Sequence, residues 1–134
     1  MPSLGAVFRR KDRWPNPDLS TGAALGIAKA RDSYWEAKGP ALDTFKQIAP
    51  EIDRVLAVLR NPVRHTSRGV NYDIYMIGRT PAATAPTIMF ACRDVEARKQ
   101  ALAAVDKSGI MEQWPAGIEL GEWEIPPHLV NLQL

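Results

Sequence analysis

Residues 70–92 read VNYDIYMIGRTPAATAPTIMFAC and decide the fold. In the first third of this stretch every second residue is apolar or aromatic, which predicts a strand with one buried face. These residues are Val70, Tyr72, Ile74 and Met76. The last part, Thr87–Cys92, is apolar almost throughout, which is typical of a strand buried on both faces. Pro, Thr and Ala dominate residues 78–86, so we expect two strands joined by a loop.

Downstream of this stretch the sequence predicts a helix and a final strand. Asp94 is a favourable N-cap for a helix over Val95–Lys107, and Ser108-Gly109-Ile110 supplies a glycine where a left-handed C-cap is needed. We expect the last strand at Ile118–Ile125, with a bulge near Gly121 where the inward pattern shifts. A helix of this length is sufficient for a right-handed crossover between parallel strands, although the spacing also permits an antiparallel last strand.

Upstream, apolar residues recur at steps of three and four from Leu42 to Leu59, which predicts a helix. Pro50 either kinks this helix or begins a second one. Before residue 40, Pro and Gly interrupt every pattern, and we expect only a short strand at Leu4–Phe8 and a poor helix over Ala23–Trp35. We therefore divide the chain into a partly ordered arm, residues 1–40, and a single domain, residues 41–134.

The expected order is strand-helix-strand-strand-helix-strand. It predicts an α+β domain with a small antiparallel or mixed sheet and two helices on one face. The split β-α-β arrangement of ferredoxin-like domains has this order of elements, and we expect that fold here.

Composition excludes several classes of protein. The 134 residues carry 17 Lys+Arg and 15 Asp+Glu, so the net charge of +2 does not by itself indicate a nucleic-acid or membrane partner. The longest apolar runs are too short to cross a bilayer, so we expect no membrane contact. The single cysteine cannot form an intramolecular disulfide, and the first residues do not follow a secretory pattern. We expect an intracellular protein, cytoplasmic or nuclear.

Candidate catalytic and metal-ligating residues are few. His65 and His128 lie far apart in sequence, and Cys92 stands alone, so we expect no metal site. No phosphate-binding glycine motif is present, and we expect no cofactor. Cys92 and His65 remain weak candidates for a small Cys-dependent enzyme, although a cysteine that ends an apolar strand more often packs in the core.

A basic segment next to an aromatic residue indicates a second kind of site. It contains Arg9, Arg10, Lys11 and Arg13, followed by Trp14. Basic side chains bind phosphates and aromatic rings stack on unpaired bases, so single-stranded nucleic-acid binding is an alternative function.

The stretches Tyr72–Arg79, Pro86–Cys92 and Ser108–Ile110 together resemble an uncharacterised domain of filamentous-fungal proteins. The resemblance covers roughly residues 41–123 and involves structural residues, with no catalytic signature. It implies a small domain that works at the front of longer chains, which favours an interaction or regulatory role.

Our leading hypothesis is a non-enzymatic module that binds a protein partner. Trp14, Trp35 and Arg64 are the expected contact anchors, because Trp and Arg are over-represented at binding hot spots. The alternative for the two tryptophans is that they hold the arm on its own domain. An exposed edge strand would also allow a homodimer.

Overall fold

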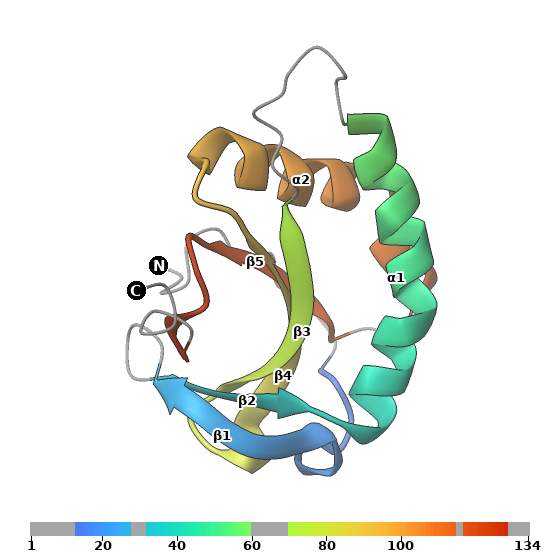
Figure 1. Ribbon diagram of the computed structural model, residues 1–134. Coiled ribbons are helices and arrows are strands. Elements are labelled where there is room, and N and C mark those ends of the chain that lie inside the picture. The colour runs from blue at the N-terminus through green and yellow to red at the C-terminus, as the bar shows by residue number, and fades with distance from the viewer. Residues whose placement is uncertain (1–12, 28–31, 60–69, 115–116, 129–134) are drawn as a thin grey trace.

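Five strands form one mixed sheet in the computed structural model, which describes residues 13–27, 32–59, 70–114 and 117–128 (Figure 1). The strands are β1 Thr21–Ile27, β2 Ser33–Ala37, β3 Asn71–Gly78, β4 Thr84–Ala91 and β5 Glu119–Trp123. Their order across the sheet follows the chain, β1-β2-β3-β4-β5. The first three pairs are antiparallel and β4 pairs with β5 in parallel.

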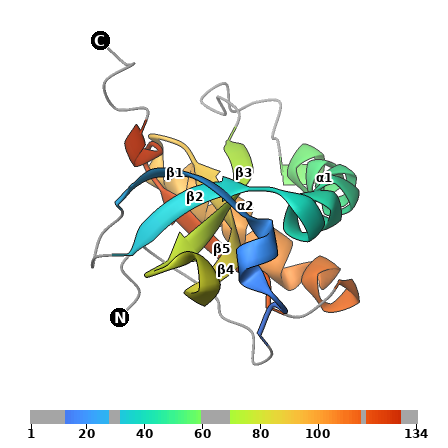
Figure 2. The same cartoon turned by 90° about the horizontal axis from the view of Figure 1, so that it is seen from below.

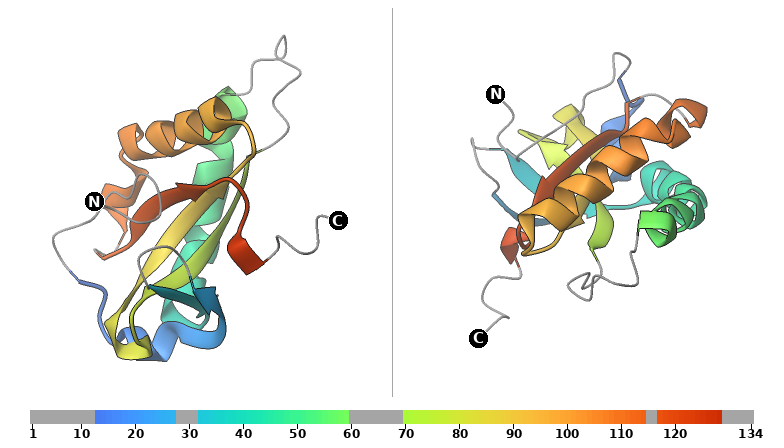
Figure 3. Two further views of the ribbon diagram at one scale, coloured as in Figure 1. Left: turned by 90° about the vertical axis from the view of Figure 1, so that its left-hand side faces the viewer. Right: turned by 90° about the horizontal axis from the view of Figure 1, so that it is seen from above.

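Two helices, α1 Gly39–Leu59 and α2 Val95–Lys107, lie on the same side of the sheet (Figure 3). Their apolar side chains share one core with inward residues of β2 to β5. Within that core, Ile48 and Ile52 of α1 and Val105 of α2 are completely buried. The chain is therefore an α+β protein with two helices on one face of a mixed sheet, as the sequence predicts.

The predicted boundaries of α2 are confirmed. Asp94 Oδ1 accepts hydrogen bonds from the amides of Glu96 at 3.0 Å and Ala97 at 3.3 Å, which satisfies two of the free donors at the helix start. Gly109 has a φ of 78° just after the helix, a conformation that glycine adopts without a steric penalty. The crossover through α2 joins β4 to β5 in parallel, so the antiparallel alternative for the last strand is wrong.

Helix α1 continues through Pro50 as one element, so a second helix does not begin there. Pro50 is exposed, whereas Ile48 and Ile52 on either side of it are buried. Water can therefore hydrogen-bond to the carbonyl oxygen four residues earlier, which receives no amide hydrogen from Pro50.

The helix expected over Ala23–Trp35 is wrong, because this region forms β1 and β2, an antiparallel hairpin at one edge of the sheet (Figure 2). The register of β1 against β2 shifts between Thr21 and Ala24 and again between Ala24 and Gly26. Such bulges destroy the alternation that would reveal a strand in the sequence. The predicted arm therefore supplies two strands of the sheet, and β2 pairs directly with β3. The strand expected at Leu4–Phe8 lies outside the described residues, so the ferredoxin-like arrangement stays a prediction.

The bulge expected in β5 is also wrong, because β5 pairs with β4 residue by residue from Thr87–Glu119 to Ala91–Trp123. Glu122 occupies an inward position at 4% exposure, where the pattern would otherwise call for an apolar residue. It does so because Arg98 of α2 pairs with it, with Nε and Oε1 2.8 Å apart. The apparent shift in the pattern comes from this buried ion pair.

A second, smaller core covers the other face of the sheet. Tyr34, Tyr75, Ile77 and Met89 are buried there and pack with Leu25 and Trp123. The turn after β5 brings His128 onto this face, and its Nδ1 lies 3.2 Å from the hydroxyl of Tyr34. Neither of the described helices is long and apolar enough to span a membrane.

Candidate functional site

A hollow of about 340 Å³ lies between the second half of α1 and the beginning of β3. Its lining consists of Asp53, Leu56, Val70, Asn71 and Tyr72, and we call it the Asp53–Tyr72 pocket. The C-terminal end of α1 and the first residues of β3 face each other at this end of the molecule (Figure 1). The pocket therefore forms where a helix and the strand that follows it in sequence begin to separate.

The local structure explains which residues reach the pocket. Asp53 and Leu56 are three residues apart on α1, so they lie on the same side of the helix. Val70, immediately before β3, and Tyr72, within it, are two residues apart, so they face the same side of the sheet. Leu56 is 7% exposed, and it gives the pocket an apolar floor beside the polar Asp53.

Tyr72 is held firmly in place. Its ring lies 5.9 Å from the ring of Phe45, edge to face, and 5.9 Å from that of Phe90. Its hydroxyl contacts the carbonyl oxygen of Ala49 at 3.0 Å and donates to Oδ1 of Asp53. Burial, and secondarily the Asp53 carboxylate, raise the pKa of Tyr72, so the phenol remains neutral and a hydrogen-bond donor at physiological pH.

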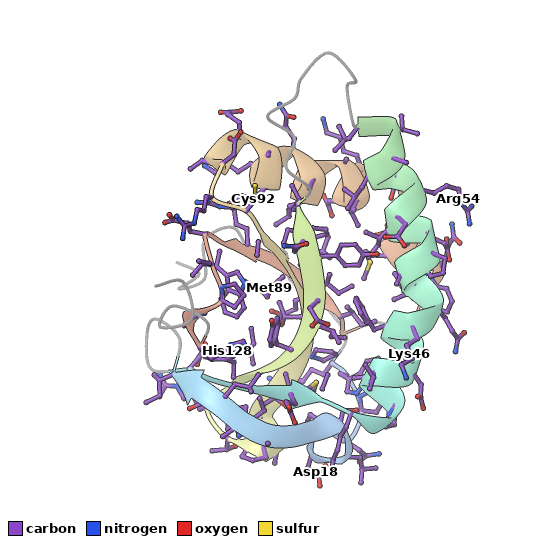
Figure 4. The ribbon with its side chains drawn as sticks, viewed as in Figure 1. Asp18, Lys46, Arg54, Met89, Cys92 and His128 are labelled. Carbon is purple, nitrogen blue, oxygen red and sulfur yellow. The ribbon has the colours of Figure 1, made fainter. Side chains whose placement is uncertain are left out.

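Asp53 places a negative charge at the pocket wall. The residue is exposed, and no cationic side chain pairs with it within the part of the chain that the structure describes. The neighbouring Arg54 extends away from the sheet, on the outer side of α1 (Figure 4). The pocket thus combines one carboxylate, one neutral phenol, one amide and two aliphatic side chains, a combination that suits a ligand with an apolar stem and a positive end.

The other buried charges of the described chain serve the fold. Arg98 pairs with Glu122 through Nε, and one of its terminal nitrogens donates to the carbonyl oxygen of Cys92 at 2.9 Å. These bonds tie α2 to the ends of β4 and β5. Both charges have partners, so this cluster offers little to a ligand.

The predicted catalytic pair of Cys92 and His65 stays a prediction, because only Cys92 lies within the described residues. Cys92 is half-buried at the end of β4, whereas His128 lies near the β1–β2 hairpin (Figure 4). His65 lies outside the described residues. No group of three or more His, Cys, Asp or Glu side chains that could hold a metal ion occurs in the described ranges.

Both tryptophans expected to be contact anchors are buried in the larger core, Trp14 at 7% and Trp35 at 9% exposure. The backbone of Trp14 lies directly against Gly117, where an added Cβ would approach the Trp14 nitrogen to 2.2 Å. In this position neither ring is available to a partner, and Trp14 cannot stack on a nucleic-acid base. Arg13 is exposed, whereas Arg9, Arg10, Lys11 and Arg64 lie outside the described residues.

Sequence reasoning missed the Asp53–Tyr72 pocket. Leu56 and Tyr72 are recognisable as inward residues, but Asp53 looks like an ordinary polar position on a helix. The hydrogen bond between the side chains of Asp53 and Tyr72 spans 19 residues, so no short-range spacing indicates it.

No protein-family model, curated protein or solved structure matches the chain. The resemblance to a domain of filamentous-fungal proteins therefore stays a prediction.

Proposed function

We propose that the chain is a non-enzymatic protein-interaction module and that the Asp53–Tyr72 pocket accepts one side chain of a partner protein. The observation that carries the proposal is the exposed carboxylate of Asp53, without a described cationic partner, beside an apolar floor and a fixed phenol. A binding site of this kind anchors a partner through one well-placed side chain, around which other contacts are weaker.

The volume of the pocket fits this role. At about 340 Å³ it lies at the lower end of the roughly 300–1,000 Å³ found for ligand pockets. One long side chain of a partner fits within it. The single cysteine of the chain is in keeping with a reducing compartment, and we propose that the module works inside the cell.

The ionisable groups of the pocket favour binding over catalysis. A general acid or base works best when its pKa lies near the working pH. The environment of Tyr72 raises the pKa of its hydroxyl further from neutrality, which makes it a poorer proton donor and acceptor in a reaction. The same shift keeps the hydroxyl available as a stable hydrogen-bond donor to Asp53.

Peptide display tests the proposal. We would select binders from a random dodecapeptide library with the full chain, and then compare binding to two variants. Val70→Phe places a larger side chain in the pocket lining, whereas Val58→Phe makes the same change at a position on α1 that is 87% exposed and outside the lining. Thermal unfolding of both variants shows whether each is folded.

Selected peptides are expected to bind the native chain and Val58→Phe equally and to lose most of their affinity for a folded Val70→Phe. Should Val70→Phe unfold, Asn71→Trp at the exposed rim serves as the second pocket-blocking variant. Failure to enrich any peptide, or equal binding to the blocked and native chains, would overturn the proposal.

A further inference from the structure

We infer that the partner side chain taken by the Asp53–Tyr72 pocket is a lysine, in preference to arginine or to an uncharged side chain of the same length. This inference rests on the proposed function, because it specifies the chemistry of the partner at that same pocket. Three features of the pocket carry it: the occupied oxygen of Asp53, the aliphatic floor and the local charge.

The first feature is that one carboxylate oxygen of Asp53 is already in use. Oδ1 accepts the hydroxyl of Tyr72, and that hydroxyl also contacts the Ala49 carbonyl. No described residue forms a hydrogen bond with Oδ2, so this second oxygen is open to a ligand. A guanidinium binds a carboxylate best through two parallel hydrogen bonds, one to each oxygen. An ammonium group acts as a compact point charge and needs only one.

The second feature is the floor formed by Leu56 and Val70. Leu56 is buried and Val70 packs against the larger core, so both present aliphatic surface to the hollow. The methylene stem of a lysine covers such surface while its charged end stays beside a polar group. In this pose the ammonium group meets Oδ2 of Asp53 at the exposed rim, where it keeps part of its hydration.

The third feature is the charge around the pocket. Among the described residues that line the hollow, Asp53 is the only charged one. An uncharged side chain would displace water from Asp53 without replacing its hydrogen bonds, which costs free energy. A cationic side chain removes that cost, so charge distinguishes lysine from its uncharged analogue, and hydrogen-bond geometry distinguishes lysine from arginine.

Titration of the ¹⁵N-labelled full chain, followed by NMR, tests the inference. The probes are the N-acetyl N-methylamides of lysine, arginine and norleucine, which share a backbone and differ in the end of the side chain. We expect the lysine probe to shift the amide signals of Asp53, Leu56, Asn71 and Tyr72 at the lowest concentration. Asp53→Asn is expected to weaken the lysine probe about tenfold, because the bond to a charged acceptor is lost.

Asp43→Asn is the matched control, since it removes the same charge from an exposed position on α1 outside the pocket. It should leave the affinity for the lysine probe unchanged. Tyr72→Phe tests the geometric argument directly, because it frees Oδ1 while keeping an aromatic ring between Phe45 and Phe90. We expect this variant to bind the arginine probe more tightly than the native chain does and to lose its preference for lysine.

The outcomes separate this inference from the proposed function. Equal binding of the norleucine and lysine probes at the pocket would overturn the lysine assignment and leave the pocket as a contact site. An unchanged preference for lysine in Tyr72→Phe would overturn the geometric argument against arginine. Absence of pocket shifts with all three probes would also overturn the lysine assignment, whereas failed peptide selection would overturn the proposed function itself.

Discussion

The two halves of the sheet differ in how regularly their strands pair. Strands β3, β4 and β5 pair without a shift in register, whereas the register of β1 against β2 shifts twice within seven residues. In the regular half, alternating apolar residues and helix-capping residues allow the strands and α2 to be predicted from the sequence. The hairpin half owes its place in the sheet to contacts with distant residues, which the sequence does not display.

The same difference affects β1, the edge strand of the sheet within the described residues. This strand contains no charged residue and no proline, the usual features that protect an edge strand from pairing with another chain. Its bulges supply protection of another kind, because they interrupt the regular row of donors and acceptors that a second strand would need. The homodimer considered from the sequence stays a prediction, and regular pairing through β1 is not favoured.

Arg98→Met in the regular half is expected to have the largest effect on stability. It leaves the side chain of Glu122, which is 5% exposed, as a buried charge without its partner. Removing one member of a buried pair lowers the free energy of unfolding by about 3–5 kcal/mol. Urea unfolding measures the loss, and Lys99→Met at the next, exposed position is the control. A loss below about 1 kcal/mol would place this pair among weak surface contacts.

Thr21→Val in the hairpin half is expected to have an intermediate effect. The Thr21 hydroxyl lies 2.8 Å from the carbonyl oxygen of Pro17 and 3.0 Å from the hydroxyl of Thr84, so it joins β1 to the start of β4. Valine has nearly the same shape but cannot form these bonds, and we expect a loss of about 1–3 kcal/mol in the free energy of unfolding. The exposed Thr80→Val is the control. Equal unfolding midpoints for the two variants would show that the hydrogen bonds of the Thr21 hydroxyl contribute nothing to the free energy of unfolding.

The smallest effect on the free energy of unfolding is expected at Tyr75 of β3, which contacts Tyr34 of β2. This effect is absent at neutral pH. Burial, followed by the charge of Asp73 and the neighbouring Tyr34, raises the pKa of Tyr75 to about 12. An unfolded tyrosine ionises near pH 10, so between pH 10 and about 12 the unfolded chain binds fewer protons than the folded one. The free energy of unfolding therefore falls as the pH rises through this range.

Tyr75→Phe is expected to make that fall shallower. The measurement is urea unfolding at several pH values from neutral to alkaline, with the native chain alongside. An identical slope for the variant and the native chain would show that Tyr75 does not contribute to the alkaline loss of stability.

Local signals in the sequence predict much of the regular half. Asp94 and Gly109 mark the two ends of α2, and alternation in residues 70–76 identifies β3. The segment 23–35 is misread because two bulges remove the alternation, while Ala23, Ala24 and Leu25 favour a helix locally. Such tertiary override of propensity is what single-sequence reasoning cannot see.

The candidate site is less predictable than the fold. The residue type of Trp14 and Trp35 predicts contact anchors, but large apolar rings also pack in cores, and the larger core contains both. Asp53 acquires its role only when α1 packs beside β3 and brings it to the hydroxyl of Tyr72. The spacing of residues along the chain does not indicate which side chains on separate elements will contact each other.

The strand order β1-β2-β3-β4-β5 has a consequence for how the chain folds. Each described strand pairs only with strands next to it in sequence, but α1 lies between β2 and β3 and α2 lies between β4 and β5, so these two pairings close longer loops than the hairpins do. The sheet can grow outward from the β3–β4 hairpin, adding one strand at each step without rearranging those already paired. Because the two helical crossovers close the longer loops, we expect the pairing of β2 with β3 and of β5 with β4 to form late.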